Sequence, residues 1–215
     1  MQIKSATFGQ LQNNCYLVTD EASGRSALVD CTEYSDKMKD FIGDAKLDYI
    51  LLTHGHFDHI GGVCPIVSAT GVPVYLGPNA TDLPDWLMRG YALPGEDEEK
   101  RKNRKLLPEE LHVLKEGDKI SLAGVEFSVL ETPGHAVGSL CYLCGDNMLS
   151  GDTLFCGTYG RTDLPGGSPA EMQRSLALVA DLPLPDETTV YPGHESFTTL
   201  GQERRSNPYL MGEVF

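Results

Sequence analysis

Short apolar runs separated by turn residues fill the first thirty positions of the chain. Residues 3–8, 15–19 and 26–30 are rich in side chains that favour strands, and polar segments with a glycine or paired asparagines lie between them. Residues 33–45 instead carry apolar side chains at helical spacing, and residues 47–53 form a further apolar run. The pattern predicts three strands, a helix and a buried fourth strand.

A helix over 61–69 and a strand over 72–76 continue this alternation until the segment 78–118 interrupts it. That segment contains several prolines, the single tryptophan and a charged run over 96–105 with four acids and five bases. We expect 78–118 to be a solvated insertion or a lid over a site.

The alternation resumes after the interruption. A helix is predicted over 169–180, and strands are predicted over 119–122, 125–131, 139–143, 147–150 and 188–191. Because strands and helices occur in both halves, the fold class is α/β, with a partly parallel sheet that is covered by helices.

Length and charge limit the classes of protein to which this chain can belong. The 215 residues fit one domain, so we interpret 1–215 as a single domain. The net charge of −14 opposes binding to phosphate backbones, so no nucleic-acid partner is expected. No apolar run has the roughly 20 residues of a membrane helix, so no membrane partner is expected. The first residues lack a secretory apolar core, which favours the cytoplasm.

The six cysteines favour buried free thiols over disulfides in a chain without an export signal. Cys141 and Cys144 form a lone C-x-x-C inside a predicted strand, without the second pair of a zinc ribbon. We therefore interpret these two residues as structural.

Four side chains of metal-ligand type follow the predicted strand 47–53 within six positions: His54, His56, Asp58 and His59. In an extended or turning loop, His54 and His56 point the same way, and the other two lie beyond and can serve a second ion. Imidazole and carboxylate ligands suit zinc, iron or manganese.

Three further candidate ligands follow other predicted strands. His135 and His194 each end a Pro-Gly-His triplet, and Asp152 follows a Ser-Gly pair. Four strand ends that meet at one sheet edge would bring all seven side chains together. His112 lies outside this scheme and is interpreted as an ordinary surface or packing residue.

The ordered set H-x-H-x-D-H, His, Asp and His resembles the metallo-β-lactamase fold hydrolases, and within them the glyoxalase II-like branch. The stretches 151–155, 160–167 and 198–209 are similar to those of small single-domain members. The resemblance covers nearly the whole chain. It implies a four-layer αβ/βα sandwich with the metal site at one edge of the two sheets.

The resemblance also implies the roles of the seven residues. His54, His56 and His135 would hold one divalent ion, and Asp58, His59 and His194 would hold a second. Asp152 would bridge the two ions, for which zinc is the first expectation and iron or manganese the alternatives. Such a pair of ions lowers the pKa of a shared water toward about 7, which supplies hydroxide for hydrolysis.

Catalytic and supporting roles follow from the same reading. Asp58 or Asp152 would orient the water or accept its proton. Asp30 ends the third predicted strand and is expected to support a ligand histidine. Arg161 and Asp163 have two interpretations, a salt bridge within a loop or a role in substrate contact and site support.

The expected reaction is hydrolysis of a small-molecule thioester such as S-lactoylglutathione. Glutathione as the thiol carrier is left open, because about twenty residues follow His194 and the glutathione-binding helical segment of glyoxalase II enzymes is not among them. In addition, Arg161 and Asp163 stand where those enzymes have Lys and Tyr.

Other functions of the same fold stay open. A mononuclear iron persulfide dioxygenase shares the Gly-Arg-Thr-Asp stretch over 160–163. A lactonase or another small-ester hydrolase, including a β-lactamase, is a further alternative. An RNA nuclease is disfavoured by the charge, and a non-enzymatic module by the full set of ligands. The sequence does not indicate the oligomeric state.

Overall fold

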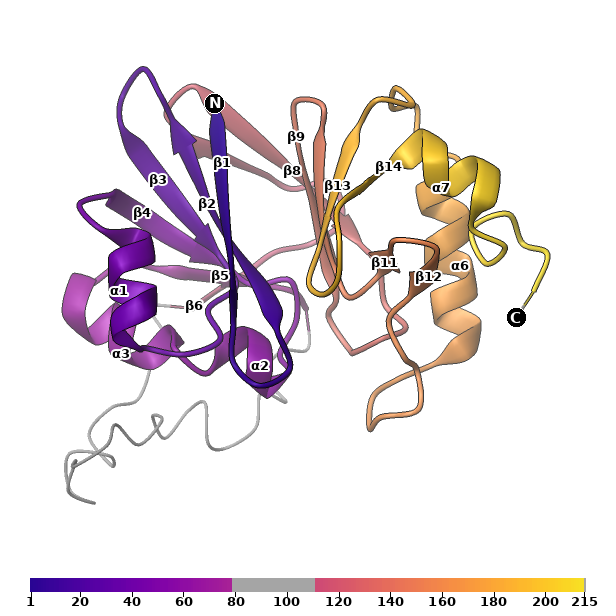
Figure 1. The fold of residues 1–215 in the computed structure, drawn as a ribbon, viewed down its shortest axis with the longest axis horizontal. Coiled ribbons are helices and arrows are strands. Elements are labelled where there is room, and N and C mark those ends of the chain that lie inside the picture. Colours follow the sequence, from indigo (N-terminus) through magenta and orange to yellow (C-terminus); the bar gives the residue numbers. More distant parts are fainter. Residues whose placement is uncertain (79–110, 215) are drawn as a thin grey trace.

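The computed structural model describes residues 1–78 and 111–214, and Figure 1 shows two sheets packed face to face with helices outside each. The first sheet has six strands, and each strand pairs with the next one along the chain. They are β1 (Gln2–Phe8), β2 (Asn13–Asp20), β3 (Arg25–Val29), β4 (Lys46–Leu51), β5 (Val74–Leu76) and β6 (Leu111–Val113). Pairing is antiparallel up to β3 and parallel from β3 to β6, as expected for a partly parallel sheet.

The second sheet has the strand order β14-β13-β10-β9-β8-β7, in which only β10 and β13 pair in parallel. Its strands are β7 (Lys119–Leu122), β8 (Val125–Glu131), β9 (Leu140–Cys144), β10 (Asn147–Gly151), β13 (Thr189–Pro192) and β14 (Thr198–Thr199). A small hairpin of β11 (Leu154–Phe155) and β12 (Thr158–Tyr159) follows β10.

Helices cover the outer face of each sheet (Figure 1). The described helices are α1 (Asp36–Ile42), α2 (Phe57–Ile60), α3 (Val63–Thr70), α6 (Pro169–Ala180) and α7 (Leu200–Ser206). Helix α6 covers the predicted range 169–180, because the Ser168 side chain accepts a hydrogen bond from the Glu171 amide and Pro169 fits the first turn. Helix α1 is shorter than predicted: Ser35 caps its start, and Gly43, with a φ of 54°, ends it.

Three separate apolar cores hold the four layers together. Phe8, Leu28 and Met38 belong to the core of the first sheet and its helices. Val29 and Phe127 belong to the core between the sheets. The third core joins the second sheet to its helices through Leu176 on α6 and Leu200 on α7, among others. The predicted four-layer αβ/βα sandwich is therefore confirmed.

The expectation for 78–118 needs one correction. Residues 79–110 lie outside the described residues, so the insertion or lid stays a prediction there. Leu111–Val113, however, forms β6 and pairs with β5 in the first sheet, so this part belongs to the sheet itself. Its three residues are too few for the alternating pattern that marks a strand.

In the described parts of the chain, none of the helices combines the length and apolar character needed to cross a bilayer.

Candidate metal centre

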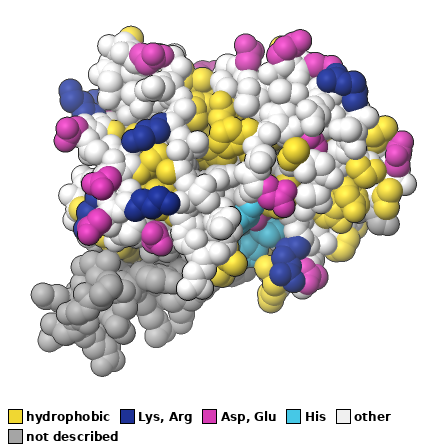
Figure 2. Space-filling model, in the orientation of Figure 1, with side chains coloured by type: hydrophobic (Ala, Val, Ile, Leu, Met, Phe, Trp, Pro, Cys, Tyr) yellow, Lys and Arg dark blue, Asp and Glu magenta, His cyan; other side chains and the backbone are white. Residues whose placement is uncertain are grey.

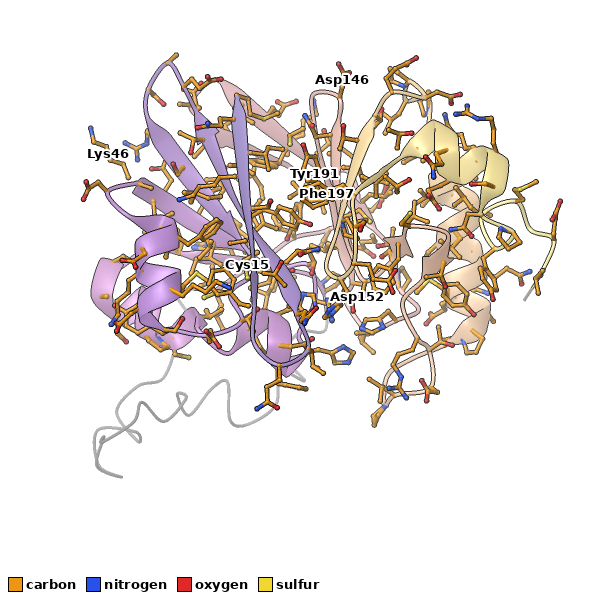
Figure 3. All side chains as sticks on the ribbon, viewed as in Figure 1. Cys15, Lys46, Asp146, Asp152, Tyr191 and Phe197 are labelled. Carbon is orange, nitrogen blue, oxygen red and sulfur yellow. The ribbon has the colours of Figure 1, made fainter. Side chains whose placement is uncertain are left out.

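Five strand ends meet at one edge of the two sheets, and the predicted residues follow them. Asp30 follows β3, His54 follows β4, and Asp152 follows β10. His135 and His194 come from the turns after β8 and β13. Figure 3 labels Asp152, which lies between the two halves of the molecule. The structure thus brings the predicted ligands to the place that the sequence indicated.

The first group consists of His54, His56 and His135. The Nδ1 atom of His56 lies 3.0 Å from Nε2 of His54 and 2.7 Å from Nε2 of His135. His54 and His56 face the same side, as the spacing of two predicts, with ring centroids 4.7 Å apart. Three ring nitrogens therefore converge on one point and could hold a cation there.

The second group consists of Asp58, His59 and His194. Oδ2 of Asp58 lies 3.2 Å from Nε2 of His194 and 3.8 Å from Nε2 of His59. His59 is fully buried and His194 is partly exposed, so this group runs from the interior to the surface of the cavity.

Asp152 lies between the two groups. Its Oδ2 atom is 3.4 Å from Nε2 of His135 and 3.5 Å from Nε2 of His194, and its Oδ1 atom is 3.4 Å from Nε2 of His59. One carboxylate thus reaches a nitrogen of the first group and two nitrogens of the second. This is the placement that a bridging ligand requires.

Hydrogen bonds on the far side of the rings set which nitrogen faces the centre. Nδ1 of His135 donates to the backbone carbonyl of Arg161, and Nδ1 of His194 donates to that of Leu11. Nδ1 of His59 faces Oδ2 of Asp30 at 2.7 Å. In each neutral ring the proton then occupies Nδ1, which leaves the lone pair of Nε2 directed inward for a cation.

Asp30 and Thr53 extend this network to His54. The Thr53 hydroxyl donates to Oδ2 of Asp30 at 2.7 Å, so it can accept from Nδ1 of His54 at 3.1 Å. Oδ1 of Asp30 accepts from the Thr53 amide. The expected support of a ligand-type histidine by Asp30 is therefore present, and Thr53, which the sequence reading did not single out, shares it.

Burial and neighbouring charges shift the pKa values of the centre. Burial lowers the pKa of His54 well below its usual range and, with His56 nearby, that of His135 to about 4. Burial also opposes charge on His59, but the carboxylates of Asp152 and Asp30 outweigh it and raise its pKa to about 9. Burial raises the pKa of Asp152. His54 and His135 are therefore neutral at pH 7, as metal ligation requires.

Two buried polar atoms without hydrogen-bond partners also fit a pair of metal ions at this site. Nε2 of His59 and Oδ1 of Asp152 are buried without a hydrogen-bond partner, although buried polar atoms are normally paired. Both atoms face the centre. A cation would satisfy both atoms, and a donor set of imidazole and carboxylate suits zinc, iron or manganese.

The prediction of a loop for Asp58 and His59 is wrong. They lie on α2, a single helical turn in which the amide of Gly61 donates to the carbonyl of Phe57. The turn aims both side chains at the second group, and the amide of Asn13 fixes it by donating to the carbonyl of Asp58 at 3.0 Å. Contacts such as those of Asn13 and the Leu11 carbonyl join distant segments, and no sequence pattern indicated them.

Arg161 and Asp163 form a salt bridge within their loop. Nε and Nη2 of Arg161 donate to the two carboxylate oxygens of Asp163 at 2.7 and 2.6 Å, and both side chains are exposed. The hydrogen bond to Asp163 raises the pKa of Arg161, and the same bond lowers that of Asp163 to about 2. Of the two interpretations, the salt bridge is observed, and Arg161 also supports His135 through its carbonyl.

A cavity of about 1120 Å³ opens over the centre. Figure 2 shows histidine side chains at the surface there, near the middle of the face. Leu76 at the end of β5 and Gly77 just after it line one side, and Phe155 and Tyr159 of the small hairpin also line the cavity. Such a volume suits a small-molecule substrate.

The remaining predictions concern residues outside the centre. His112 stacks on Tyr75 with ring centroids 4.9 Å apart, which confirms it as a packing residue. Cys141 and Cys144 lie buried in β9, and none of the six cysteines, all of which the structure describes, forms a disulfide. Five of the six are buried, as predicted, and Cys156 is partly exposed.

The sequence model of the metallo-beta-lactamase superfamily matches residues 8–194 of this chain. The chain belongs to this superfamily. Among curated relatives, the hydroxyacylglutathione hydrolase GloC of Haemophilus influenzae is 33% identical over 220 residues, which are 98% of each chain.

Solved structures of the superfamily share the fold. A di-iron-bound form of TTHA1623 is 38% identical, with a TM-score of 0.76 over 96% of this chain and 99% of that one. The BLEG-1 B3 metallo-beta-lactamase is 31% identical, with a TM-score of 0.79 over 98% of this chain and all of that one. The superfamily therefore includes metal-binding relatives that resemble this chain over nearly its full length.

Proposed function

We propose that this protein is a dinuclear metal-dependent hydrolase that cleaves a small-molecule thioester, as a glyoxalase II-like enzyme does. The observation that carries the proposal is the position of Asp152, within 3.5 Å of nitrogens of both ligand groups. We assign His54, His56 and His135 to one cation and Asp58, His59 and His194 to the other. Zinc is the expected metal, and the di-iron relative keeps iron as the alternative.

When bound, the cations would polarise the scissile carbonyl and lower the pKa of water toward about 7. The side chains of the protein position these groups. Asp152 lies within 3.5 Å of nitrogens of both ligand groups, and Asp30 holds His59 in the orientation that directs Nε2 inward. Asp58 presents a carboxylate to the cavity. Burial raises its pKa, but the neighbouring His194 and His59 together outweigh burial and lower it. Ionised at neutral pH, it can accept the proton of the attacking water.

The thioester substrate is supported by the relative GloC, which is named a hydroxyacylglutathione hydrolase and matches 98% of this chain. The cavity supports it as well, because its volume admits a small molecule with both an acyl and a thiol part. Glutathione itself remains one candidate carrier among several.

The test is release of free thiol from a panel of thioesters, including S-lactoylglutathione, by the zinc-loaded protein. We expect turnover of at least one thioester and loss of turnover when a chelator removes the metal. A protein that cleaves no thioester, yet consumes oxygen with a persulfide when loaded with iron, would instead be a dioxygenase. Turnover of lactones or β-lactams alone would point to the other small-ester hydrolases.

A further inference from the structure

The wall of the cavity is apolar away from the metal centre. Leu11, Phe57 and Val137 line it, and these residues are 54%, 53% and 45% exposed. Leu164 and Pro165 continue the same wall. Large apolar side chains that stay exposed around one opening provide surface that an apolar ligand can cover.

Charge is scarce on this wall. Among the described residues that line the cavity, apart from the histidines and the carboxylates of the centre, only Arg161 and Glu195 are charged. Glu195 would repel an anionic group. Arg161 is the cationic one of the two. Its Nε and Nη2 atoms both donate to the carboxylate of Asp163. A bidentate pair of this kind is held by geometry as well as by charge.

We infer that the described wall of the cavity favours thioesters whose acyl and thiol groups are apolar and uncharged, and that Asp163 contributes to this preference by withholding Arg161 from anionic substrates. The inference rests on the proposed function, whose substrate class it narrows. It follows that a carboxylate on the substrate gains no ion pair with the described wall, while each methylene gains apolar contact.

Binding of non-hydrolysable thioethers tests the inference separately from turnover. The probes are S-butyl-N-acetylcysteamine and S-butyl-N-acetylcysteine, which differ by one carboxylate, titrated calorimetrically into the metal-loaded protein. D163N should free Arg161 and tighten binding of the carboxylate probe about threefold, the size of an exposed ion pair. The neutral probe should bind with the same affinity before and after the substitution.

Two control variants isolate the effect. D163E keeps a carboxylate for Arg161 and should leave the carboxylate probe at its original affinity. E126Q removes one negative charge from an exposed pair with Lys119 on the second sheet, so it reports any effect of net charge alone. Equal tightening by D163N and E126Q, or no tightening by D163N, would overturn the role of Asp163.

A chain-length series tests the apolar wall. Lengthening the S-alkyl group of the neutral probe from methyl to hexyl should tighten binding, by up to about fourfold for each methylene that becomes buried. L11S and V137S should flatten this dependence. Affinity that is independent of chain length would overturn the inference. The corresponding thioesters, assayed for hydrolysis, test the proposed function: tight binding without turnover would reject thioester hydrolysis and leave the ligand preference standing.

Discussion

At the scale of single residues, Asp30 shows how a side chain outside the ligand groups controls them. Its two oxygens accept from the Thr53 amide, the Thr53 hydroxyl and Nδ1 of His59. Its φ of 57° lies in the left-handed region, which aspartate tolerates better than most residues. With this backbone conformation, the carboxylate faces Thr53 and His59.

Substituting Asp30→Asn tests this role. Asparagine has the same size and tolerates the same backbone conformation, but its amide cannot fix His59 as a carboxylate does. We expect metal affinity to fall about 10- to 100-fold, in line with other supporting partners of metal-ligating histidines. Competition with a chromophoric chelator measures it. The exposed Asp146→Asn serves as the control, and equal affinity of both variants would show that Asp30 has no such role.

The thiols provide a second test at this scale. Burial raises the pKa of Cys15 and Cys144 to about 12 and that of Cys141 to about 11. At pH 8 these thiols stay protonated and unreactive. Partly exposed Cys156 should therefore react first with a disulfide reagent, as a single fast phase that Cys156→Ser removes. Several fast phases in the native protein would contradict the burial of the other thiols.

The sequence indicated the seven ligand-type side chains because four of them cluster within six positions after a predicted strand, and each of the other three follows a glycine at a predicted strand end. It indicated Asp30 because that residue ends a predicted strand, but not which histidine it supports. The carbonyls of Leu11 and Arg161 accept hydrogen bonds from ligand-type histidines, and the sequence could not predict this because every residue has a carbonyl. Only the fold decides which carbonyl meets a ring nitrogen.

At the scale of elements, α7 holds the small hairpin that lines the cavity. Glu203 on α7 is fully buried and accepts from the Gly157 amide, the Thr198 hydroxyl and the Asn207 side chain. Asn207 also donates to the carbonyl of Thr158. The hairpin β11–β12 is thereby tied to the C-terminal helix.

Substituting Glu203→Gln tests this connection. The amide group can accept through only one oxygen, so at least one buried donor loses its partner. We expect the free energy of unfolding to fall by about 1–3 kcal/mol, measured by urea denaturation. Glu187→Gln, at an exposed position, should leave the stability unchanged. If both variants are equally stable, the Glu203 contacts contribute nothing.

Long elements with a regular pattern were predictable, and short ones were not. Helix α6 has an N-cap serine, a proline in its first turn and buried side chains at helical spacing. The strands β11, β12 and β14 have two residues each, too short for any periodicity. Helix α2 has one turn, also too short for any periodicity, and the Asn13 side chain that contacts it comes from a distant part of the sequence.

At the scale of the whole molecule, the buried thiols of the cores make the stability of the fold decrease at alkaline pH. Burial raises the pKa of Cys15, Cys141 and Cys144 above the value of 9.0 for a free thiol. Above pH 9 the unfolded chain releases these protons while the folded chain keeps them, so stability falls as pH rises. The urea concentration at the unfolding midpoint should therefore decrease between pH 9 and pH 11, the range from the pKa of a free thiol to the raised pKa of Cys141. A constant midpoint would contradict the burial of these thiols.

The central claim is that seven side chains from strand ends of both sheets and the adjoining α2 hold a pair of cations that Asp152 joins. Metal content of the zinc-reconstituted and dialysed protein, measured by mass spectrometry, tests it most directly, with Asp152→Ala beside Asp146→Ala as the control. We predict two ions per chain in the wild type and the control, and reduced occupancy of both positions in Asp152→Ala. A wild type without bound metal, or an Asp152→Ala variant that keeps two ions, would contradict the claim.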